Sequence, residues 1–233
     1  MTVSGQSVPP ADSFLLAENS TSLLLMAAAL FFAAMLGIPA VLQGKIRFLF
    51  GYWQSLPCLM FLLGALLMPT RAKLNEYRQK VKLAAFALLT LSPFPTWAAR
   101  SAGNEYFELC SIACLASAFW LQLEVCQWLR SIANIDKNPI LALSAKKTQF
   151  LLLCFSIIPL SAVYVSGLLG LYTGTSKSLQ DVIDIWGYGR ISMILRVFLY
   201  WSMLQFLTLC LYANFIAMRQ IKKALAKENH EQN

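Results

Sequence analysis

The chain alternates between long apolar blocks and short polar connectors. Six apolar blocks lie at about 23–42, 48–68, 83–99, 106–129, 150–172 and 197–218. Each is about 17 residues or longer, close to the length that an α-helix needs to cross a bilayer. The pattern therefore predicts an all-α fold, a polytopic membrane protein built as a bundle of about six transmembrane helices.

The same pattern divides the chain into three parts. Residues 1–22 are expected to form a polar cytoplasmic N-terminal segment, 23–218 the six-span transmembrane domain, and 219–233 a basic cytoplasmic C-terminal tail. The N-terminal segment has no basic residues, and the apolar run after it is about as long as a span. These two features predict an uncleaved first helix and not a cleaved signal peptide.

Composition supports a membrane protein and argues against several other classes. The chain is 58% hydrophobic and 13% charged, whereas a soluble domain carries about a quarter charged residues. The net charge of +8 comes from basic residues between and after the apolar blocks, so nucleic acid is not an expected partner. All six cysteines fall within apolar runs, which argues against a secreted disulfide framework. No cofactor is predicted.

The distribution of basic residues predicts which ends face the cytoplasm. With six spans, the N-terminus, the connectors at 70–82 and 130–149 and the C-terminal tail share one side. That side carries most of the 19 Lys and Arg residues. The positive-inside rule then predicts a multi-pass protein of the cell membrane with both termini in the cytoplasm.

Local signals refine the connectors. Pro93 and Pro95 remove two backbone donors, so the outer end of the third block is expected to be irregular. Segment 130–149 is expected to be a long connector in which Asn138 caps a short surface helix at about 140–145, with Pro139 at its first position. Apolar residues at helical spacing in 179–186 predict an amphipathic helix lying at the membrane interface.

The block at 106–129 carries the only carboxylates within any predicted span, Glu108 near its start and Glu124 near its end. Its small and polar residues fall on two nearly opposite arcs of a helix, one including Glu124 and the other Glu108 and Gln122. Because polar groups avoid lipid, this helix is expected to pack on two sides and to lie centrally.

Two interpretations of the charged residues remain open. Glu108, Arg196 and Arg100 could form an outward-facing polar binding pocket beside the proline turn, because ionisable residues inside a membrane are candidate functional sites. The alternative is that these side chains lie near enough to the interface to anchor in headgroups. Glu124 and Gln122 present the same choice on the inner side.

No catalytic motif is present, including a nucleophile elbow, an HExxH zinc motif or a P-loop, so an enzyme is not favoured. The preferred function is a non-enzymatic scaffold or accessory subunit whose small-residue faces bind other membrane subunits or a second copy of the chain. The alternative is a permease or a protein that handles lipids or small amphiphiles through the outer pocket. The lipid bilayer is the expected partner in both cases.

Overall fold

The computed structural model describes residues 15–43, 55–69, 71, 74–101, 104–158, 161, 165 and 190–231, and within these ranges it is helical without a strand. The all-α prediction is confirmed for this part of the chain. The elements are α1 (Leu15–Glu18), α2 (Ser20–Gln43), α3 (Ser55–Leu66), α4 (Asn75–Leu91), α5 (Phe94–Arg100), α6 (Glu105–Ile135), α7 (Pro139–Leu152), the π-helical turn η4 (Leu153–Ile157) and α10 (Arg190–Glu231).

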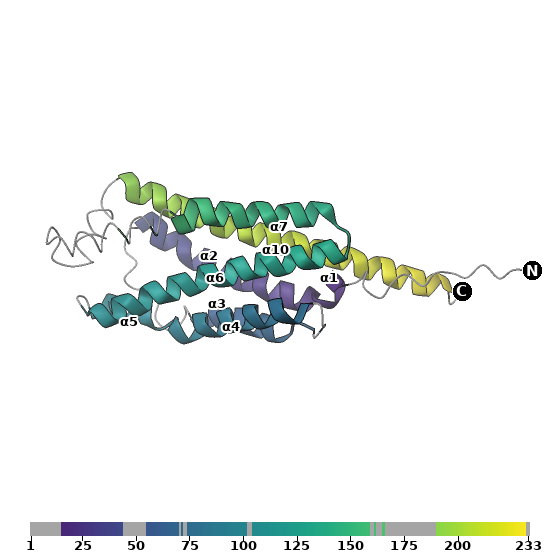
Figure 1. The fold of residues 1–233 in the computed structure, drawn as a ribbon, viewed down its shortest axis with the longest axis horizontal. Helices are drawn as coiled ribbons and strands as arrows, with labels where there is room; N and C mark the ends of the chain where they lie inside the picture. The colour runs from purple at the N-terminus through teal and green to yellow at the C-terminus, as the bar shows by residue number, and fades with distance from the viewer. Residues whose placement is uncertain are drawn as a thin grey trace, which may run out of the picture.

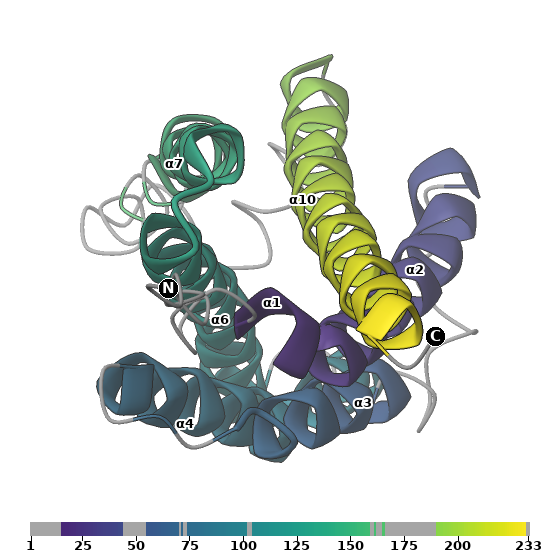
Figure 2. The same cartoon turned by 90° about the vertical axis from the view of Figure 1, so that its right-hand side faces the viewer.

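The helices form an elongated antiparallel bundle (Figure 1). Contacts follow a cyclic order in which α2 packs on α3, α3 on α4, α4 on α6, α6 on α7, α7 on α10, and α10 again on α2. Figure 2 shows this arrangement along the bundle. The start of α1 and the C-terminal end of α10 lie at the same end, which we call the α1 end (Figure 1).

Helix α6 packs on two sides, as its two polar arcs predict, with α4 and α5 on one side and α7 on the other. It is one member of the cyclic arrangement and not a hub for every other helix. Its buried residues lie between Ser117 and Ala133, in the half nearer the α1 end. Trp128 is the largest fully buried side chain described in the bundle.

The prediction of a long connector at 130–149 is wrong. Helix α6 continues to Ile135, and α7 begins at Pro139 after a three-residue turn. Lys137 in this turn has a φ of 52°, the left-handed conformation that often terminates a helix. Asn138 caps α7, as predicted, because its side chain accepts a hydrogen bond from the backbone N–H of Leu141 at 3.2 Å. The cap therefore opens a long packed helix instead of a short surface helix.

The irregularity predicted beside Pro93 and Pro95 is found as a break between two helices, but the outer end of the block beyond it is helical and not irregular. Helix α4 ends at Leu91, and the separate helix α5 begins at Phe94 and packs on α6. Part of the basic connector predicted at 70–82 is helical instead, because α4 already begins at Asn75. The amphipathic helix predicted at 179–186 lies outside the described residues.

The predicted polar segment 1–22 is also partly helical. Leu15 and Leu16 of α1 are buried, and α2 begins at Ser20. Helix α1 contacts α10 and α2, while the backbone N–H of Leu16 donates to Asp136 Oδ2, in the turn between α6 and α7, at 3.4 Å. This short helix thus reaches across one end of the bundle.

Among the described residues, two helical stretches are long and apolar enough to cross a membrane, Leu109–Ile135 and Trp201–Ala226, and two shorter apolar helices are Ser20–Ala33 and Ser55–Leu66. This result favours membrane association without establishing the predicted number of spans.

Candidate functional site

Glu124 is the one candidate carboxylate whose side chain the structure describes. It is 9% exposed, and its Oε1 accepts a hydrogen bond from the Trp120 indole N–H at 3.1 Å. Its Oε2 is buried and has no hydrogen-bond partner among the described residues. Gln122, two positions earlier, is only partly buried. The two side chains therefore occupy different environments on the same helix.

A cation on α4, Lys80, interacts electrostatically with Glu124. Lys80 donates to Glu76 Oε1 at 2.7 Å, one helical turn earlier. The hydrogen bond with Glu76 and the negative charge of Glu76 raise the pKa of Lys80 above its ordinary value, and the charge of Glu124 makes a smaller contribution in the same direction. Glu124 thus lies within electrostatic range of a cation on the neighbouring helix.

The predicted outer pocket lies outside the described side chains. The backbones of Glu108, Arg100 and Arg196 belong to α6, α5 and α10 respectively, but the positions of their side chains are not described. Helices α5 and α6 are in contact, whereas α7 lies between α6 and α10 in the cyclic order. The pocket therefore stays a prediction.

An aromatic cluster lies where α5 meets α6. Phe94 and Trp97 have ring centroids 5.2 Å apart in an edge-to-face arrangement, and Phe94 also approaches Tyr106 at 6.1 Å and Phe107 at 6.3 Å. Trp97 and Tyr106 are exposed. Aromatic side chains of this kind are enriched where a membrane meets water.

The α1 end holds a polar node that sequence patterns did not single out. Asp136 accepts hydrogen bonds from the Leu16 backbone at 3.4 Å and from Gln220 Nε2 of α10 at 3.3 Å. Partial burial raises the pKa of Asp136 above its ordinary value, against the lowering effect of these hydrogen bonds. On the same short helix, Glu18 forms an ion pair with Arg71. The hydrogen bonds of Asp136 therefore link α1, the α6–α7 turn and α10.

A groove of about 210 Å³ lies between α7 and α10. Helix α7 supplies Ser144, Lys147, Thr148 and Leu151, and α10 supplies Gln205, Thr208, Leu209 and Tyr212. Both sets follow the same i, i+3, i+4, i+7 spacing, which places each set on a single face of its helix. That spacing is visible in the sequence, but an interpretation of 130–149 as a connector does not reveal the α7 half of the groove.

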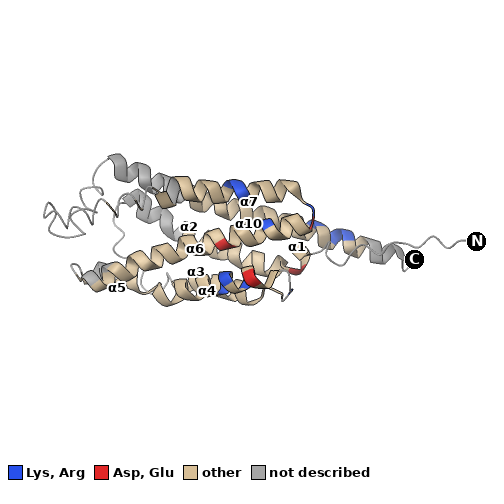
Figure 3. Cartoon of the chain, in the orientation of Figure 1, with Lys and Arg blue, Asp and Glu red and all other residues tan. Residues whose placement is uncertain are grey.

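Charged side chains are concentrated toward the α1 end in the part of the chain that is described (Figure 3). No group of three or more potential metal ligands occurs among the described residues. No protein-family model matches the chain, and no similar protein was found among the curated proteins or the solved structures.

Proposed function

We propose that this chain is a multi-pass integral membrane protein of the cell membrane, with about six helical spans and both termini in the cytoplasm. The supporting observation is the separation of exposed apolar residues from charged ones. Large apolar side chains are exposed on each long helix, for example Phe31, Leu63, Phe86, Leu109, Phe150 and Phe215. Soluble monomers rarely expose apolar surface so extensively.

The dimensions of α6 agree with this proposal. Tyr106 of the aromatic cluster and Glu124 are 18 residues apart, a rise of about 27 Å along a helix. This length is close to the hydrocarbon thickness of about 30 Å. We therefore place the outer boundary of the hydrocarbon near the aromatic cluster and the inner boundary near Glu124, so that the cationic α1 end faces the cytoplasm.

Reporter fusions test the topology. A reporter fused before Thr2 and one fused after Asn233 should both be active only in the cytoplasm, and carbonate washing should leave the protein in the membrane pellet. Activity of the two reporters on opposite sides of the membrane contradicts the topology, and release by carbonate contradicts membrane insertion.

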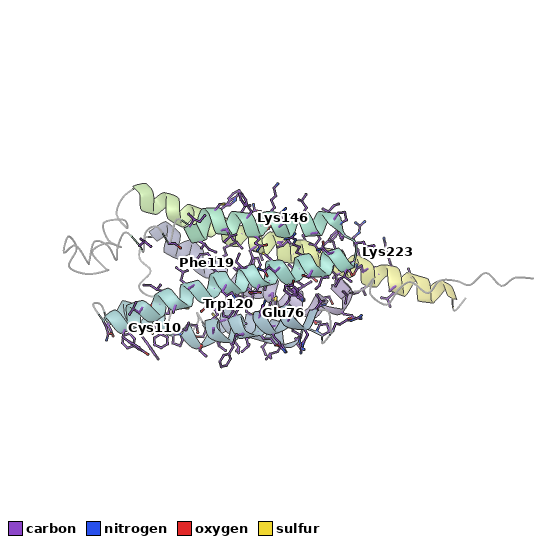
Figure 4. The ribbon with its side chains drawn as sticks, viewed as in Figure 1. Glu76, Cys110, Phe119, Trp120, Lys146 and Lys223 are labelled. Carbon is purple, nitrogen blue, oxygen red and sulfur yellow. The ribbon has the colours of Figure 1, made fainter. Side chains whose placement is uncertain are left out.

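Within the membrane we propose a non-enzymatic role as a scaffold or accessory subunit. Helix α10 has 42 residues, a length of about 63 Å, which is twice the hydrocarbon thickness. Gln220 is the residue through which it contacts Asp136 at the α1 end. Beyond it, α10 projects from the bundle (Figure 1) with Lys222 and Lys223 exposed, and Figure 4 labels Lys223 on this projection. An exposed basic helix offers a binding surface to a partner subunit.

The packing of α2 limits which surfaces of the chain are free to bind such a subunit. Ala29 of α2, a small residue of the kind that allows helices to approach closely, is fully buried within the chain. Gly64 of α3 lies against Ser22 and Met26 of α2. These small residues serve packing inside the bundle, so the projecting end of α10 is the better candidate for contact with a partner.

Truncation after Gln220 tests the scaffold role. The full chain, purified in mild detergent, should have a mass corresponding to a defined complex or homo-oligomer, and the truncated chain should be smaller while keeping the melting temperature of the bundle. Light scattering coupled to size exclusion measures the mass. A monomeric mass for both chains overturns the role.

A lipid-handling protein is the second candidate. The groove between α7 and α10 favours it, because polar side chains from two helices converge there beside exposed apolar residues. This observation moves the candidate binding region from the outer side, where the sequence placed it, to the inner side.

A further inference from the structure

The groove between α7 and α10 has the chemistry of an anion site. Its lining contains one cationic side chain, Lys147, and no carboxylate. Among the described residues no acidic side chain forms an ion pair with Lys147. A lysine ammonium binds phosphate groups as a point charge, so an anionic oxygen is the ligand that would neutralise it here.

The neighbouring polar groups can add hydrogen bonds. The side chains of Ser144, Thr148, Gln205 and Tyr212 make no hydrogen bond to another described residue, although all four line the groove. The Thr208 hydroxyl is different, because it donates to the carbonyls of its own helix at 2.8 and 3.1 Å. Hydroxyl and amide donors from both helices therefore remain available to an acceptor in the groove.

The depth of the groove matches a lipid headgroup. Lys147 lies eight residues after the start of α7, about 12 Å from the turn that joins α6 and α7, and Glu124 lies 11 residues before the end of α6, about 17 Å from the same turn. Since we place the inner edge of the hydrocarbon near Glu124, Lys147 lies at the level of the inner-leaflet headgroups.

An apolar side chain beside the groove suits an acyl chain. Phe150 follows Lys147 by three positions on α7, so helical spacing places it next to the groove and about one turn farther from the α1 end, toward the hydrocarbon. It is exposed. The volume of about 210 Å³ leaves room for a headgroup phosphate while the acyl chains stay outside.

We propose that this groove binds the phosphate of an anionic phospholipid of the inner leaflet, with Lys147 as the charge partner and the Tyr212 hydroxyl among the donors. The inference rests on the membrane topology proposed above. In this proposal one lipid is a specific ligand of the groove, in addition to the lipids of the surrounding bilayer.

The test uses the full chain in mild detergent. Phosphatidylglycerol is added, with phosphatidylcholine in parallel, and bound lipid is counted by native mass spectrometry alongside the melting temperature. The wild type should retain phosphatidylglycerol in preference to phosphatidylcholine. Lys147→Gln should weaken retention about five-fold, the effect expected for one lysine near an anionic lipid surface.

Lys146→Gln is the matched control, because Lys146 is the adjacent residue, equally charged and exposed, but does not line the groove (Figure 4). It should retain phosphatidylglycerol like the wild type. Tyr212→Phe removes only a hydroxyl and should weaken retention less than Lys147→Gln. Equal loss in both lysine variants, or no loss in either, overturns the site.

Inorganic phosphate separates a lipid site from a site for a soluble anion. It should neither stabilise the wild type nor displace the lipid at concentrations comparable to those of the lipid. Lys147-dependent binding of inorganic phosphate without lipid retention overturns the lipid as ligand. The topology is measured by carbonate washing and reporter fusions, so a failed lipid test with intact topology counts against the groove alone.

Discussion

Helices α2 and α3 meet through small residues, whereas α7 and α10 meet through longer polar ones. At the first contact the Ser22 hydroxyl donates to the Gly64 carbonyl at 2.6 Å, and both residues are buried. At the second, polar side chains leave a groove of about 210 Å³. The comparison teaches that small residues allow helices to approach closely, while longer polar side chains keep open a space that a ligand can enter.

The largest expected effect comes from filling the tight contact. A Cβ atom on Gly64 would lie 3.1 Å from Met26 Cγ and 3.1 Å from the Ser22 carbonyl oxygen. Gly64→Leu should therefore destabilise the bundle by about 1–3 kcal/mol, despite the better helix propensity of leucine. Denaturation in mixed detergent micelles, followed by circular dichroism, measures the change.

Ala116→Leu is the control for that variant, because Ala116 is exposed on α6. It should leave the unfolding free energy unchanged within experimental error. A Gly64→Leu variant as stable as this control would show that α2 and α3 do not pack as closely as described.

The next largest effect is expected when serine is replaced by alanine at each of the two helix contacts. Ser22→Ala removes the hydroxyl that donates to Gly64, whereas Ser144→Ala removes a groove hydroxyl without a described partner. Helix propensity changes equally in the two variants. Ser22→Ala should therefore be less stable than Ser144→Ala by about 0.6–1.5 kcal/mol, measured by the same denaturation. Equal stabilities would remove the energetic distinction between the two contacts.

The smallest effect is expected at Asp136, which links the start of α7 to α10 through Gln220. Its pKa is raised above the ordinary 3.8, chiefly by burial. A raised pKa in the folded state means that the protonated form is favoured there, so its stabilising contribution is complete below pH 3.8 and is lost as the pH rises through the folded value.

The melting temperature of the wild type, measured relative to Asp136→Asn, should thus fall as the pH increases above 3.8. The asparagine variant cannot ionise and serves as the reference at each pH. A relative stability that rises over the same interval would mean that the hydrogen bonds from Leu16 and Gln220 outweigh the cost of burying the carboxylate.

Local sequence signals predicted several elements correctly. Asn138 and Pro139 predicted the start of α7, and Pro93 and Pro95 predicted the break before α5, because a cap and a missing backbone donor act within a few residues. The polar arcs of α6 predicted packing on two sides, since helical spacing decides which residues share a face.

Signals based on average polarity failed at the boundaries. Lys146 and Lys147 made 130–149 resemble a connector, although both belong to α7. Long lysine side chains can extend along an apolar surface to water, so their presence does not terminate a helix. Leu15 and Leu16 likewise fall within a segment of polar average composition, and a four-residue helix is too short for a periodic pattern to reveal it.

Some residues of the candidate sites could be identified from local sequence signals and others could not. Glu124 could be identified from the sequence, because it is a carboxylate inside an apolar block, and it is buried. Asp136 and the residues of the groove could not, because their partners are distant in the chain: Asp136 meets Leu16 and Gln220, and Lys147 shares a groove with Tyr212.

By itself, the sequence determined that the described part of the chain is helical, where α7 begins, where the chain breaks before α5, and that α6 packs on two sides, because periodicity, caps and prolines act locally. Only the tertiary structure decided that α1 reaches across the bundle, that α6 is one member of a cyclic order, and that α7 and α10 enclose a polar groove. These features depend on which helix faces lie together, and that is settled by packing between residues far apart in the sequence.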